Sequence, residues 1–279
     1  MASAASQAPS MAEYVTHHLQ NFANKYQKSL IDFSVIHYDT LFWSVVCGII
    51  ACLGMYIISR KATAEAPGRL QSVVEILSEM ADGMAKEQIP GDRRFIAPLA
   101  LTIFVWIALM NCMDFLPVDV FGQLFHWTGL DYYLPYHKAV PTADLNGTIG
   151  ISFGVVLLML FFSLKVKGIG GFLHEKFFTP FGPFLAPFNL FLHIIEYLSK
   201  MVSLAMRLWG NMYAGELLFL MIAMLGGHMT LSVTGSFLFV SHVIFGAIWA
   251  IFHILIVFLQ AFIFMTLTLV YLGLSYQKH

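Results

Sequence analysis

The sequence predicts an all-α, polytopic membrane protein. Hydrophobic residues make up 58% of the 279 residues and charged residues only 11%, whereas soluble domains carry about 25% charged residues. The hydrophobic residues gather in segments long enough to cross a bilayer as helices, and the two longest are about twice that length. The net charge of −1 gives no general attraction to nucleic acid, so we expect no nucleic-acid partner.

Five apolar segments are expected to form membrane helices. They lie at about 41–58, 95–113, 147–164, 183–226 and 236–276. About 20 apolar residues cross a hydrocarbon core of about 30 Å, so the first three segments fit one helix each. The last two would be roughly 60–65 Å long as helices. Because neither contains a polar loop, we expect two long, strongly tilted helices, with a break at Gly210 or Gly215 as the alternative in the fourth segment.

The rest of the chain divides into an extension and an amphipathic segment. Residues 1–38 are polar and are expected to form an outer-side N-terminal extension, ahead of a single membrane domain over 39–279. Within about 67–88, apolar residues recur at helical spacing and the acidic Glu75, Glu79 and Asp82 lie between them. This pattern is typical of an amphipathic helix that lies in the membrane interface.

Basic residues between the spans predict the orientation. The first loop carries Arg60, Lys61, Arg69, Lys86, Arg93 and Arg94, the second only Lys138, and the third Lys165, Lys167 and Lys176. Loops rich and poor in basic residues therefore alternate. The positive-inside rule places the N-terminus outside and the C-terminus inside, and so predicts the orientation of a multi-pass protein in contact with lipid.

Polar residues form one face of the fourth apolar segment. At 100° per residue, Glu196, Lys200 and Asn211 fall within about 40° of Arg207, and Glu216 falls on the opposite face. Arginine at a helix centre costs about 2.5–3.5 kcal/mol and cannot lose its proton. No acid stands three or four residues from Arg207. We therefore expect its counter-charge to be a carboxylate on another protein, with a purely structural role as the alternative.

The last apolar segment carries His242, His253 and Gln260 on one face. If the two long helices fold as an antiparallel hairpin, the residue numbers of facing pairs have a nearly constant sum. Arg207 and Gln260 add to 467, and Glu216 and His253 add to 469. One register thus brings both pairs together, and Glu216 with His253 is predicted to relay protons from the outer face because both can titrate.

Further titratable residues lie on both sides of Arg207. Glu196 with Lys200 and His193 is predicted to form an inner-side proton exit, with a simple helix salt bridge as the alternative. Asp39 and His242 are expected to be interfacial, Asp114 to end a helix near the outer surface and Asp144 to cap the next helix. A role for Asp114 or Asp144 at a proton entrance is the alternative.

Four stretches resemble the F-type ATP synthase subunit a family in its proteobacterial form. They are RLWGNMYAGELLF at 207–219, AIFHILIVFLQAFIFMTLTLVYL at 250–272, PLALTIFVWIALMNCMDFLP at 98–117 and KVKGIGGF at 165–172. The resemblance implies that Arg207 is the family's essential arginine, which faces a rotor ring of c subunits. It also implies that Asn211, Glu216, His253 and Gln260 line the proton path. The chain departs from the family at Met201, where relatives often have proline, and at His193, where some have a carboxylate.

The resemblance implies a proton-translocating stator subunit in a bacterial inner membrane, with two half-channels against the c-ring and a subunit b stalk as a second partner. Such a subunit is not catalytic alone, and no cofactor is expected. The chain has no phosphate-binding Gly-rich loop, so we expect no ATP binding. Two rival hypotheses are a self-contained ion transporter and a haem-binding membrane anchor that uses His242 and His253.

Overall fold

The computed structural model describes residues 22–25, 34–63, 67–116, 127–129, 138–227 and 232–276. Apart from one isolated bridge between Ala23 and His37, the named elements of these residues are helices. They are α2 (Tyr38–Arg60), α3 (Arg69–Gln88), α4 (Ile96–Cys112), α6 (Leu145–Phe178), α7 (Ala186–Gly227) and α8 (Val233–Tyr276), with 3₁₀ turns η1 (Met113–Phe115), η2 (Pro141–Ala143) and η3 (Pro183–Leu185).

Within the part of the chain that the structure describes, five helices are long and apolar enough to cross a membrane. They are Tyr38–Arg60, Ile96–Phe115, Leu145–Phe178, Pro183–Gly226 and Val233–Tyr276. The all-α, polytopic class expected from the sequence is therefore confirmed. Most of the expected N-terminal extension, together with Lys278, lies outside the described residues.

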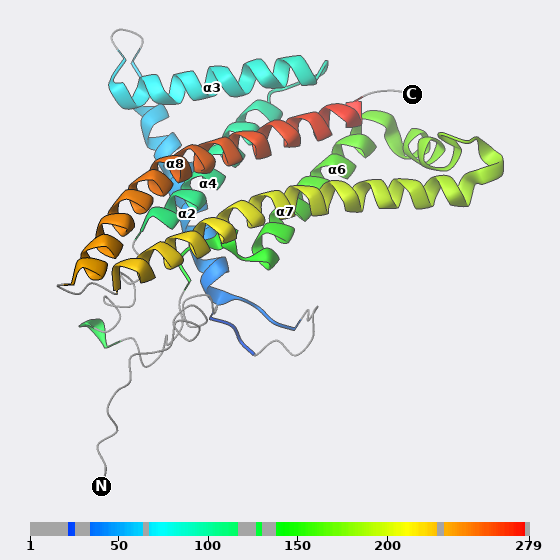
Figure 1. The fold of residues 1–279 in the computed structure, drawn as a ribbon. Coiled ribbons are helices and arrows are strands. Elements are labelled where there is room, and N and C mark those ends of the chain that lie inside the picture. The colour runs from blue at the N-terminus through cyan, green and yellow to red at the C-terminus, as the bar shows by residue number, and fades with distance from the viewer. Residues whose placement is uncertain are drawn as a thin grey trace.

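The two longest helices are continuous. α7 has 42 residues and α8 has 44, about 63 Å and 66 Å at 1.5 Å per residue. They run antiparallel and cross the group formed by α2, α4 and α6 at a steep angle (Figure 1). The alternative of a break at Gly210 or Gly215 is wrong. Helices of this length fit a core of about 30 Å only when strongly tilted.

The third apolar helix, α6, is divided at Gly168, where φ is +70° and ψ is 166°. Its first part ends within a few residues of position 164, the end expected from the sequence, but Lys176 lies on the second helical part rather than in the expected loop. Only glycine adopts this conformation readily. The lysines are tolerated because Lys167 and Lys176 pair with Glu175, and Lys165 and Lys176 lie over aromatic rings.

The amphipathic helix α3 lies across one end of the bundle, as expected (Figure 1). Its small residues Ala81 and Ala85 are buried, whereas Leu70 and Ile76 are exposed. The C-terminal end of α3 packs closely against α8. A Cβ on Gly273 of α8 would come within 2.6 Å of the backbone oxygen of Gln88, the last residue of α3. The C-terminal end of α8 therefore lies on the same side of the molecule as the basic first loop.

The main core lies between α4 and α8. Ile107 and Met110 of α4, together with Phe264 and Met265 of α8, are fully buried in one hydrophobic cluster. Leu204 and Leu208 of α7 belong to the same cluster. This packing fixes the rotation of α7 and thereby decides which of its side chains face away from the core.

Candidate functional site

Arg207 lies on the exposed face of α7. Its helix neighbours Leu204 and Leu208 are buried against the core, whereas Val202 and Met206 are exposed beside it. Among the described residues, Arg207 forms no ion pair or hydrogen bond. The chain thus holds a permanent cation on an open face of a membrane-spanning helix, without a counter-charge from its own described part.

Polar clusters flank Arg207 along α7. Glu196 and Lys200 precede it, and Lys200 lies about 10 Å away along the helix axis at 1.5 Å per residue. Asn211 and Glu216 follow it, and Glu216 lies about 14 Å away by the same measure. We call Glu196 and Lys200, with His193, the inner cluster and Asn211 and Glu216, with His253, the outer cluster, after the sides that the sequence predicts for them. A proton that moved directly along α7 from one cluster to the other would have to pass Arg207.

His253 lies at the centre of the outer cluster, in a closely packed pocket. Its ring is fully buried between Phe115, Phe219 and Trp249, and its Nε2 lies 2.6 Å from Asp114 Oδ2. Asp114 follows the end of α4, as the sequence predicts, and its side chain is buried. The contact with His253 gives this carboxyl group a polar partner, which lowers the cost of burying it.

Glu216 is paired with a lysine. Its Oε2 lies 2.8 Å from Lys138 Nζ, and both side chains are buried. The expected partner was His253. Neither this contact nor the one between His253 and Asp114 is aligned as a hydrogen bond.

The predicted register of α7 and α8 is nevertheless confirmed. A Cβ on Gly215 would lie 2.3 Å from His253, and one on Gly226 would lie 3.1 Å from His242. Both pairs of residue numbers add to 468, within the predicted 467 to 469. His242 packs here against α7, with its Nδ1 2.6 Å from the backbone oxygen of Ile222.

Gln260 meets Asn211 rather than Arg207. The Asn211 Nδ2 donates to Gln260 Oε1 at 2.7 Å. The amide nitrogen of Gln260 is buried and finds no hydrogen-bond acceptor among the described residues. The hydrogen bond joins α7 and α8 four residues after Arg207, on the side of the outer cluster.

The inner cluster contains the three residues predicted for it. Lys200 Nζ lies 2.5 Å from Glu196 Oε1, and His193 Nδ1 lies 3.3 Å from Glu196 Oε2. They line a cavity of about 320 Å³ whose wall also includes Lys167, Glu175 and Ser275. The geometry fits both the proton exit and the simple salt bridge that the sequence left open.

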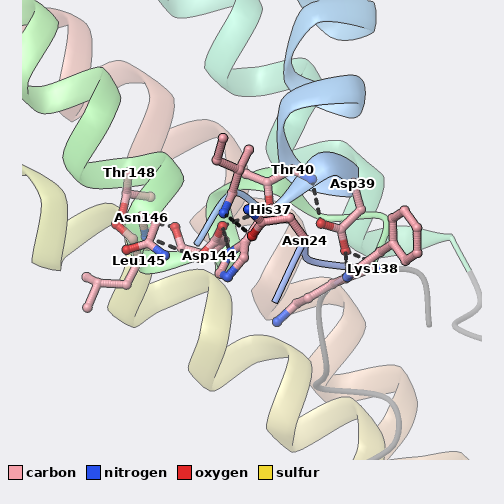
Figure 2. A network of polar contacts seen from close by, with 11 residues as sticks. Asn24, His37, Asp39, Thr40, Lys138, Asp144, Leu145, Asn146 and Thr148 are labelled. Atoms are coloured by element: carbon pink, nitrogen blue, oxygen red, sulfur yellow. Dashed lines mark hydrogen bonds and ion pairs between the residues drawn. The ribbon is translucent and has the colours of Figure 1, made fainter. Parts of the chain in front are cut away.

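A third cluster joins the beginnings of α2 and α6, and we call it the helix-cap cluster (His37, Asp39, Thr40 and Asp144; Figure 2). Asp144 caps α6 as predicted, because its Oδ1 accepts from the backbone N–H of Asn146. Its Oδ2 lies 2.7 Å from His37 Nδ1 and accepts from Thr40 Oγ1 at 2.8 Å. Asp39, expected at the interface, lies in the first turn of α2, and its side chain is buried at 3% exposure.

The pairing changes the proton affinities of both partners. The hydrogen bond to Asp144 raises the pKa of His37 above its ordinary value of 6.5. Burial alone would raise the pKa of Asp144, but the hydrogen bonds from His37, Thr40 and the Asn146 backbone lower it below its ordinary value of 3.8. The pairing therefore favours the charged forms of both groups.

An exposed arginine that has no partner within the described residues, placed between two titratable clusters on long apolar helices, indicates a membrane protein of the ion-translocating class. Comparison with known proteins agrees. The family model described as the ATP synthase A chain matches residues 41–273, and the chain belongs to the ATP synthase subunit a family.

Curated relatives named ATP synthase subunit a match over nearly their whole length. One from Paracidovorax citrulli (strain AAC00-1) is 50% identical over 286 residues, which cover 98% of each chain. One from Acidovorax sp. (strain JS42) is 50% identical, again over 98% of each chain. One from Ectopseudomonas mendocina (strain ymp) is 45% identical over 98% of this chain and 99% of the relative.

Sequence reasoning missed Lys138 and underrated Asp114. Lys138 was used only to count loop charges, and its position depends on the path of a segment without helical periodicity. Asp114 stands in the NCMDFLP stretch, directly after a buried helix. An acid directly after a helix whose last turn is mostly apolar, with Asn111 as its polar residue, is the one signal that could have pointed to a buried carboxylate.

Proposed function

We propose that this chain forms two proton half-channels against a ring of c subunits and thereby couples proton flow to rotation and ATP synthesis. The observation that supports this most strongly is the placement of Arg207, which is exposed and unpaired within the described residues and separates the outer cluster from the inner one. The proposal also fits the family to which the chain belongs.

In this mechanism, a proton from outside reaches Glu216 and His253 and is passed to a carboxyl group on the ring. The neutral carboxyl then moves through lipid, where a charged one would be costly. On its return to Arg207 it loses the proton towards Glu196, Lys200 and His193, because a fixed cation favours the ionised carboxylate. Each proton that crosses 100 mV releases about 2.3 kcal/mol.

We further propose that the N-terminus is outside and the C-terminus in the cytoplasm of a bacterial inner membrane. Two parts of the chain support this orientation, because they lie on the same side of the molecule. They are the first loop, with its six basic residues, and the end of α8 near Gly273. The positive-inside rule assigns that side to the cytoplasm. A subunit b stalk is the second proposed partner, and the largely exposed apolar surface of α2 offers room for its membrane helix.

The test uses the assembled complex in membrane vesicles. Replacing Arg207 by alanine is expected to abolish ATP-driven proton pumping while ATP hydrolysis by the complex continues. The matched control is Arg60→Ala, because Arg60 is also an exposed arginine but lies at the end of α2 over the Tyr56 ring. Coupled pumping by the Arg207→Ala complex at the control's rate would defeat the proposal.

A further inference from the structure

Lys138 is a buried cation on the outer side of the bundle, and the mechanism above does not use it. It is 6% exposed, and its partner Glu216 is also 6% exposed. Its Nζ lies 2.8 Å from Glu216 Oε2 and 5.7 Å from the centre of the Tyr213 ring. A lysine ammonium is strongly hydrated in water, so a site this dry must provide a countercharge.

The helix-cap cluster holds the backbone of Lys138 in place. The backbone N–H of Lys138 donates to Asp39 Oδ2 at 3.2 Å. Asp39 also accepts from the backbone N–H groups of Thr40 at 2.8 Å and Phe22 at 2.9 Å. Through Thr40, whose hydroxyl donates to Asp144, this anchor connects to the first turn of α6.

The contacts thus form one continuous polar chain. It runs from His37 through Asp144, Thr40 and Asp39 to Lys138, as Figure 2 shows, and then through the lysine side chain to Glu216 of α7. Among the described residues, the titratable groups in this region also include Tyr213, whose ring faces Lys138, His253 of α8, which packs on Gly215, and its partner Asp114. Lys138 is the cation that contacts Glu216 within this described set.

We propose that Lys138 is a positioning residue of the outer proton path, whose ammonium is the fixed countercharge against which Glu216 takes up and releases each proton. This inference rests on the proposed function and adds a residue to it. Glu216 accepts a proton as its carboxylate becomes a carboxylic acid, and Lys138 keeps its own protons throughout. The ammonium then favours return to the carboxylate, so the proton moves on instead of staying.

Without the ammonium, the buried Glu216 would favour its neutral form, because an uncompensated carboxylate is costly in a dry site. The Glu216 carboxyl group would then release its proton only at lower outside proton concentrations, that is, at higher outside pH. A merely structural pair, one that only ties this segment to α7, predicts less assembled protein but no change in the pH dependence of proton flow. The pH profile therefore separates the two roles.

The experiment measures passive proton flow through the assembled membrane sector in proteoliposomes, driven by a potassium diffusion potential and followed as a function of the outside pH. Lys138→Met is expected to move the profile by about one pH unit or more towards alkaline pH, a tenfold change in proton concentration. Lys138→Arg, which keeps the charge, is expected to restore it. The matched control is Lys165→Met, since Lys165 is an exposed lysine over the Phe162 ring.

An unchanged profile in Lys138→Met overturns the inference. If that variant does not assemble, Asp39→Asn tests the same claim by weakening the anchor of Lys138 while leaving both charges of the pair. It is expected to shift the profile in the same direction, and an unchanged profile there is equally decisive against the inference. If Arg207→Ala abolishes pumping while these profiles stay unchanged, only the role of Lys138 fails, and the proposed function stands.

Discussion

A methyl group added at Gly215 tests the packing around His253. A Cβ at this position would lie 2.3 Å from His253 Cε1, whereas ordinary contacts begin at 3.4 Å. The ring would therefore have to retreat by the difference, about 1.1 Å. It has little room to do so, because Phe115, Phe219 and Trp249 surround it. Overpacking of this kind costs about 1–3 kcal/mol.

The same displacement would change function, because His253 lies 2.6 Å from Asp114. A misplacement of about 1 Å at a reacting group can lower a rate by about 10²-fold. We therefore expect Gly215→Ala to reduce ATP-driven proton pumping by one to two orders of magnitude, measured in inverted vesicles at equal amounts of assembled complex.

Two other glycines of the same helix contact provide a graded control. A Cβ on Gly226 would lie 3.1 Å from His242, and one on Gly246 would lie 3.6 Å from Ile222. Gly226→Ala should therefore have a small effect, and Gly246→Ala should pump like the unaltered complex. If Gly215→Ala pumps as well as Gly246→Ala, the assigned position of His253 is wrong.

Three further predictions follow from particular contacts. Gly168→Ala should destabilise the chain by about 1–3 kcal/mol, because the φ of +70° at Gly168 suits only glycine. An unchanged midpoint of thermal unfolding in detergent would contradict this prediction. The pair of His37 and Asp144 should stabilise the protein fully between the ordinary pKa values of 3.8 for Asp144 and 6.5 for His37. That contribution should be lost as pH rises through the raised pKa of His37, or falls through the lowered pKa of Asp144. His37→Gln should remove the alkaline part of this dependence from thermal unfolding curves, and an identical pH dependence in the variant would refute the pairing. A double-mutant cycle between Asn211→Ala and Gln260→Ala should give a coupling of about 0.5–1.5 kcal/mol for their hydrogen bond, whereas strict additivity would argue against it.

The helices could be predicted because their signals are local or periodic. Apolar length alone gives the five spans, and the positions of polar residues along α7 and α8 give a register that Gly215 with His253 and Gly226 with His242 confirm. The same reasoning placed Arg207, Glu196 and Lys200 on one helix face. Glu196 and Lys200 do form an ion pair.

The partners of the outer residues could not be predicted. Which group meets Glu216 depends on where residues 138–140 lie against α7, and no periodic pattern in the sequence encodes that placement. Lys138 reaches Glu216 because its backbone is held by Asp39, which lies 99 positions away in the chain. Asp114 was available to His253 only because α4 packs against α8. Both pairings depend on tertiary structure rather than on spacing.

The central claim is that Arg207 faces an anion on a moving neighbour, and crosslinking at the adjacent position tests it most directly. A photoreactive residue in place of Met206, which is exposed beside Arg207, should link to a c subunit in the assembled complex. The same residue in place of Leu208, which is fully buried, should link only within its own chain. Crosslinks from position 206 solely to lipid, or to other parts of this chain, would contradict the account.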